Sequence, residues 1–217
     1  MNDSDIFDLL NKGGLLVWPI LFCSVMGMTI YFERLTVFRK VLKCLGEDDP
    51  IYAMISTGNI SDAQSFLSKN ETEWALDKRI IQEALNVDVS DRETVEMVLI
   101  HSVSRELTIL SRTLNTLAIF GSTLPLLGLL GTVIGMIKAF SVVENMGGSV
   151  NAVVLAGGIW EAMLTTALGL LAAIPLLFFH NHLDGKLQAI QAELEEVAIN
   201  FMKAWVLAKE KLNSENS

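Results

Sequence analysis

The chain has 217 residues, of which 51% are apolar and 19% are charged, and its mean hydropathy is +0.44. This composition excludes a disordered chain, a collagen and a small disulfide-stapled domain. The net charge of -9 argues against a nucleic-acid partner, which would require a basic face. Nearly all charged residues lie between or after three long apolar stretches, a pattern typical of a protein embedded in membrane lipid.

The three apolar stretches predict three transmembrane helices, over residues 13–33, 114–140 and 153–179. The first is uncharged from Gly13 to Phe32, and Glu161 is an isolated carboxylate in the third. Each stretch reaches the ~20 residues that a helix needs to cross ~30 Å of hydrocarbon. The expected fold class is therefore an all-α membrane protein with three spans.

The basic residues predict the orientation of these spans. They follow the first span, precede the second and follow the third: Arg34, Arg39, Lys40, Lys43, Arg105, Arg112, Lys186, Lys203, Lys209 and Lys211. By the positive-inside rule, the loop 34–113 and the segment 180–217 are cytoplasmic. The N-terminus 1–12 and the short loop 141–152 are then periplasmic, and the protein is a multi-pass protein of the bacterial inner (plasma) membrane.

The cytoplasmic segments carry apolar residues at helical spacing. From Ser90, one such pattern continues directly into the second span, and a second pattern runs from Leu183 to Phe201 after the third span. Two spans are therefore expected to extend as long cytoplasmic helices, while Asn59–Asp62 predicts a turn before a shorter helix. Packing of these apolar residues within one chain and packing between subunits are equally compatible with the pattern.

The polar residues inside the spans are the candidates for an ion pathway. A carboxylate within a span costs several kcal/mol, so Glu161 is expected to face a cavity or a polar partner. Thr165 lies four residues further on the same helix face, and Thr166 begins a second polar edge about 100° around the helix. Thr132 in the second span completes the set, although a threonine in a span more often bonds the carbonyl of its own helix than lines a pore.

Small residues mark the predicted helix contacts. Gly121, Gly128 and Gly135 repeat every seven residues in the second span, with Gly131 between the last two, and Gly169 follows Thr165 by four residues in the third. Such spacing lets another helix approach closely. We expect these five glycines to serve helix packing or to line a pore.

Motifs for other chemistry are missing from the sequence. His180 and His182 do not share a helix face, so they predict no metal site. Cys23 and Cys44 are expected to be free thiols. No phosphate-binding glycine loop and no nucleophile with its base is recognisable. We therefore expect no enzyme activity and no cofactor. The energy for any work that the protein does is then expected to come from outside the chain.

Two long segments resemble the signatures of a known family. Residues 124–137 (LPLLGLLGTVIGMI) are similar to the second-span signature of the MotA/TolQ/ExbB proton-channel family, and residues 158–175 (GIWEAMLTTALGLLAAIP) to its third-span signature. The segment 31–35 (YFERL) and the Arg92-Glu pair fit the same family. Leu124 departs from the alanine that often precedes the proline.

The resemblance implies a ring of five subunits, a homo-oligomer that encloses two copies of an ExbD/TolR-like single-span partner. Thr132, Thr166 and Glu161 would then form the path of the coupling ion, a proton or sodium. Ion entry would drive movement that passes to a TonB- or TolA-like protein. Three spans resemble the ExbB and TolQ branches, whereas flagellar stator subunits resemble four-span proteins.

Two alternative functions stay open on the sequence: a motility motor of the stator type, and a membrane scaffold that anchors a partner without ion flow. The sequence does not separate a proton from a sodium ion, or outer-membrane import from envelope maintenance. Residues 45–88 carry no motif that identifies a partner.

Overall fold

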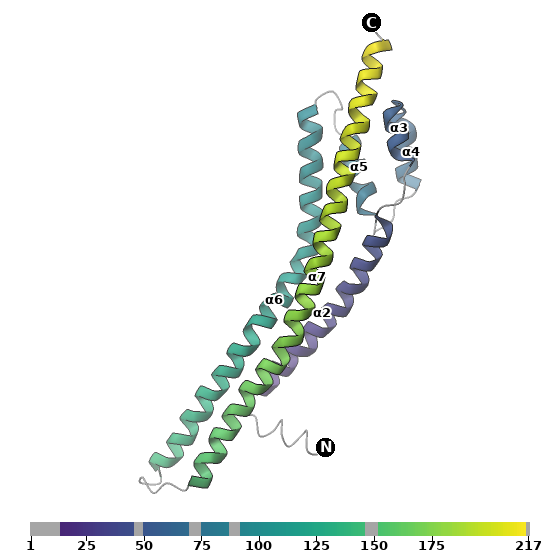
Figure 1. Ribbon diagram of the computed structural model, residues 1–217. Coiled ribbons are helices and arrows are strands. Elements are labelled where there is room, and N and C mark those ends of the chain that lie inside the picture. The colour runs from purple at the N-terminus through teal and green to yellow at the C-terminus, as the bar shows by residue number, and fades with distance from the viewer. Residues whose placement is uncertain (1–13, 46–49, 70–74, 87–91, 146–151, 216–217) are drawn as a thin grey trace. The chain divides into compact units, whose positions relative to one another are not determined.

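The computed structural model describes residues 14–45, 50–69, 75–86, 92–145 and 152–215, and every regular element in these residues is helical. The predicted N-terminus 1–12 lies outside the described residues, as do residues 146–151 of the predicted loop 141–152, whereas residues 141–145 and 152 are helical. Figure 1 shows the helices, which are α2 (Val17–Cys44), α3 (Ile51–Ser56), α4 (Ile60–Lys69), α5 (Leu76–Leu85), α6 (Arg92–Asn145) and α7 (Ala152–Glu215).

The all-α fold with three long apolar helices is confirmed. Helices α2, α6 and α7 are each long and apolar enough to cross a membrane. Helix α6 has 54 residues and α7 has 64. At 1.5 Å per residue they are roughly 80 and 95 Å long, far more than the ~30 Å of hydrocarbon. The two long helices therefore continue well beyond the membrane, as expected, and the chain is a multi-pass membrane protein.

Helix α2 also continues past the end of its predicted span at residue 33, as far as Cys44. The charges at Glu33 and Arg34 end the apolar stretch, but they do not end the helix. In the next turns of the helix, the side chains of Phe38 and Val41 are at most 1% exposed. A hydropathy pattern locates the edge of the membrane, whereas the helix ends where its buried side chains end.

The chain divides into two compact units. The first, called here the membrane unit, contains α2 up to Glu33, α6 from Thr113 and α7 up to His182. Its outward-facing side chains are apolar on all three helices, with Phe22 65%, Leu126 64% and Leu171 69% exposed. An apolar exterior of this kind suits lipid rather than water.

The second unit contains the rest of α2, the short helices α3, α4 and α5, the start of α6 and the end of α7. Helix α4 packs on both α3 and α5. The predicted apolar pattern of α7 is buried here, since Leu183, Ile190, Leu194 and Phe201 are all 0% exposed. These four side chains thus pack within their own chain.

Candidate functional site: polar groups at the α6–α7 contact

Glycines bring α6 and α7 of the membrane unit into backbone contact. A Cβ added to Gly128 would lie 3.0 Å from the Cα of Thr166, and one added to Gly169 would lie 2.7 Å from the carbonyl oxygen of Leu124. A Cβ on Gly135 would lie 2.6 Å from the Cβ of Ala162. No side chain fits at these positions, so the small residues fix how closely the two helices pack.

The two remaining glycines of the predicted set meet side chains. A Cβ on Gly131 would collide with the side chain of Thr165, and one on Gly121 would lie 2.8 Å from the Cδ2 of Leu177. All five glycines therefore face α7 or, for Gly169, α6.

The three threonines make different hydrogen bonds. Thr166 Oγ1 donates across the helix contact to the Gly128 carbonyl at 2.7 Å. Thr165 Oγ1 donates to the Glu161 carbonyl at 3.2 Å, and Thr132 Oγ1 to the Leu129 carbonyl at 2.7 Å, both within their own helix. A hydroxyl bonded to its own helix keeps its oxygen lone pairs available to a further donor or a cation.

Glu161 faces a cavity of about 250 Å³ beside the α6–α7 contact. The cavity is lined by Gly14, Leu15, Leu16, Gly131, Ile134, Gly135, Lys138, Glu161, Ala162 and Thr165. Gly14 has a φ of +75°, and a Cβ added to it would lie 3.2 Å from Glu161 Oε1. The backbone before α2 therefore passes close to the carboxylate, where a side chain would crowd it.

Thr132 lies on another side of α6. It lines an open groove formed by α6 residues alone, and this groove shares no residue with the Glu161 cavity. At about 100° per residue, Thr132 and Lys138 are about 120° apart around α6, and Glu161 and Thr166 are about 140° apart around α7. Among the described residues, the structure brings Glu161 and Thr165 to one cavity but leaves Thr132 outside it.

A known protein family matches the part of the chain that contains the glycine-rich contact of α6 and α7 and its polar groups. The family model described as the MotA/TolQ/ExbB proton channel family matches residues 71–196, which is more than half of the chain. The chain belongs to the MotA/TolQ/ExbB proton channel family. The match covers all the candidate ion-path residues, whereas the segment 31–35 lies before it. No curated protein matches the chain.

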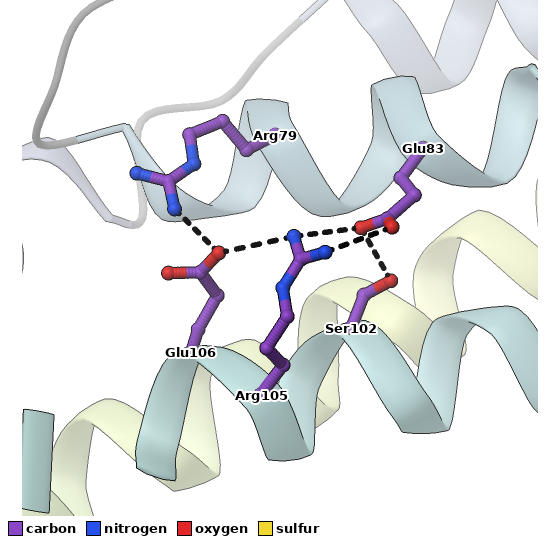
Figure 2. Close-up of polar contacts among 5 residues, drawn as sticks. All are labelled: Arg79, Glu83, Ser102, Arg105 and Glu106. Carbon is purple, nitrogen blue, oxygen red and sulfur yellow. Dashed lines mark hydrogen bonds and ion pairs between the residues drawn. The ribbon is translucent and has the colours of Figure 1, made fainter. Parts of the chain in front are cut away.

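The second unit of this MotA/TolQ/ExbB family member contains a network of charged side chains between α5 and α6 (Figure 2). Arg105 binds Glu83 through two hydrogen bonds, of 3.1 and 3.0 Å, and Ser102 Oγ donates to Glu83 at 2.8 Å. Glu106, whose side chain is 3% exposed, accepts from Arg79 and, at 3.4 Å, from Arg105. Two positive and two negative charges thus balance around a buried carboxylate.

Most of this network has no signal in the sequence. Arg105 and Glu106 are neighbours in the sequence and they pair, but nothing local to them shows that Glu106 is buried. The partners of Arg105 and Glu106 on α5 lie 22 and 27 residues away in sequence, too far for any spacing rule. A helical pattern identifies neighbours on one helix and not those on another.

The cysteines and histidines named in the sequence analysis do not line the cavity of Glu161. Both cysteines, Cys23 and Cys44, are free thiols. The described residues contain no group of metal ligands, and His180 lies 3.4 Å from the side chain of its neighbour Asn181. His182 instead lies beside the ring of Tyr31, with the ring centroids 6.3 Å apart.

Proposed function

We propose that this chain is the ring-forming subunit of an ion-driven motor in the bacterial inner membrane, on the ExbB/TolQ-like branch of its family. Five copies surround two copies of an ExbD/TolR-like single-span protein, and entry of protons or sodium ions moves this partner against the ring. The movement passes to a TonB- or TolA-like protein for outer-membrane transport or envelope maintenance. Family membership and three candidate spans support this proposal.

The observation that carries the proposal is the cavity at Glu161. A carboxylate in a membrane span is costly and normally serves an ion pathway or a polar partner. Glu161 faces a cavity beside Thr165, and no hydrogen bond or ion pair of its carboxylate is found among the described residues. The cavity and the oxygen atoms around it suit a small cation, because oxygen atoms replace part of the hydration shell of an ion.

The separation of the polar groups supports a path completed by other chains. Glu161 and Thr132 line different surfaces of the α6–α7 pair. An ion path that uses both therefore needs atoms from a neighbouring copy or from the single-span partner. This requirement favours a complex over a channel within one subunit.

The energy comes from the membrane potential and not from catalysis in the chain. One elementary charge that crosses 100 mV releases about 2.3 kcal/mol, so several ions can drive a sizeable conformational step. In this proposal the chain is not an enzyme and holds no cofactor. Its N-terminus is periplasmic and its C-terminus cytoplasmic, in keeping with the basic residues that flank the spans.

The proposal is tested on the complex that co-purifies with the tagged full-length chain. Native mass spectrometry should give five copies of the chain with two of a small single-span protein. In reconstituted vesicles, Glu161→Gln and Thr166→Val should abolish ion flux with the assembled mass unchanged. Flux driven by a proton gradient and flux driven by a sodium gradient, measured separately, identify the coupling ion.

Matched controls separate this function from the alternatives. Thr29 is an exposed threonine of α2 that bonds its own helix, at 2.9 Å to the Val25 carbonyl, so Thr29→Val should leave flux unchanged. Gly135→Leu should break assembly, since the glycine contacts Ala162. A wild-type complex without ion flux, whose function survives Glu161→Gln, would instead support the non-conducting scaffold. A motility defect on deletion would support the stator-type motor.

A further inference from the structure

The cavity at Glu161 holds a second charge, on Lys138. Among the side chains that line the cavity, Glu161 and Lys138 are the charged ones, and they have opposite signs. Lys138 comes from α6 and Glu161 from α7, so two helices that pack against each other present these charges to one space. No ion pair within 4.0 Å joins them in the described part of the chain, so the space between the two charges is open to a third group.

The helix contact fixes these two residues at one level. A Cβ on Gly135 would touch Ala162, so these two residues lie at the same level of the α6–α7 contact. Lys138 lies three residues after Gly135, and Glu161 immediately precedes Ala162. Both side chains therefore leave the contact within about one turn of the same point, on the side of the cavity.

A lysine that lines such a cavity can reach either the carboxylate or the polar edge of the membrane. Inside the cavity its ammonium is attracted by the Glu161 carboxylate, and in surroundings of low dielectric constant this attraction is strong. When a cation neutralises the carboxylate, the ammonium loses that attraction. Its flexible stem then lets it move out to the polar edge of the membrane, and Lys138 is already exposed in the structure.

We propose that Lys138 is a positioning residue of the ion path, which competes with the incoming monovalent cation for the Glu161 carboxylate. This inference rests on the proposed function, because it assigns a role within the same path. The ammonium of Lys138 and the cation are attracted to the same carboxylate, so each weakens the attraction of the other. The competition sets how much of the cation is needed to load the site.

The test measures cation flux into vesicles that contain the co-purified complex, with an enclosed dye that responds to protons or to sodium. Lys138→Gln should lower the cation concentration for half-maximal flux about tenfold, because a competing positive charge is gone. Lys138→Arg, which keeps the charge, should remain close to the wild type. Lys203 is an exposed lysine of α7 in the second unit and does not line the cavity, so Lys203→Gln is the matched control and should change nothing.

The outcomes separate this inference from the function on which it rests. Wild-type complex without flux, or Glu161→Gln with normal flux, overturns the proposed function and the inference together. Normal wild-type flux that Glu161→Gln abolishes, with an unchanged half-maximal concentration in Lys138→Gln, overturns the inference alone. Lys138 would then be only an anchor at the membrane edge.

A second variant covers a failure of Lys138→Gln to assemble. The double variant Lys138→Gln/Glu161→Gln removes both charges and should assemble again if the two charges stabilise each other across the cavity. Continued failure to assemble overturns the inference. The mass of the ring in native mass spectrometry gives this result without any flux measurement.

Discussion

The α6 backbone that lies against Gly169 predicts that Gly169→Ala destabilises the membrane unit. The new Cβ would lie 2.7 Å from the Leu124 carbonyl oxygen, 3.0 Å from the Gly128 Cα and 3.2 Å from the Gly128 nitrogen. All three are backbone atoms, so no side-chain rotation relieves the overlap. The helices must separate by several tenths of an ångström, which also stretches the 2.7 Å hydrogen bond from Thr166 to Gly128.

The expected loss of stability for Gly169→Ala is about 1–3 kcal/mol, the usual cost of added atoms in a well-packed contact. It exceeds the gain of about 1 kcal/mol that alanine brings to a helix over glycine. The assay is thermal unfolding of the full-length protein in detergent, followed by circular dichroism. The change should appear as a lower Tm with the helix content of the folded protein unchanged.

Two glycines of the same helix provide the controls for Gly169→Ala. A Cβ on Gly157, in the membrane unit, or on Gly185, in the second unit, meets nothing within 4 Å. Gly157→Ala and Gly185→Ala should leave Tm unchanged or raise it, because only helix propensity changes. A Gly169→Ala protein as stable as the Gly185→Ala protein would refute the view that backbone contact at this point fixes the helix packing.

Two further predictions concern other contacts. Glu106→Gln should destabilise the second unit by about 1–3 kcal/mol, since it leaves Arg79 without its buried carboxylate. Glu83→Gln should cost less, because the Glu83 side chain is 36% exposed. Urea unfolding compares the two variants, and equal losses of stability would contradict the role of burial. Tyr31 stacks on Phe179 with ring centroids 4.0 Å apart, so Tyr31→Ala should lower Tm and Tyr31→Phe should not. Equal effects of the two variants on Tm would contradict a stabilising role of the stacked rings.

Local properties of the sequence predicted the main features of this fold. A run of ~20 residues almost without charge fixes a span, because burying charges in hydrocarbon is costly wherever the rest of the chain lies. Apolar residues at helical spacing predicted that α6 and α7 continue past the membrane. The pattern of one such helix is complete in its own sequence, and it does not depend on a partner.

The sequence predicted which residues belong to the candidate site but not how they are arranged in space. Glu161 and Thr166 were recognisable because polar side chains are rare in apolar spans. The bond from Thr166 to the Gly128 carbonyl joins residues 38 positions apart, and no spacing rule selects that partner. The same holds for Lys138, which the sequence places at the end of a span and the structure places in the cavity of Glu161.

The sequence by itself therefore determined that the chain is helical, crosses a membrane three times and carries isolated polar groups in its spans. Only the tertiary structure decided which of these groups meet: Glu161 with Lys138 and Thr165 at one cavity, and Thr132 on another surface. The physical reason is the register between α6 and α7. Contacts such as those of Gly128 and Gly169 set this register, and they exist only when two distant segments pack together.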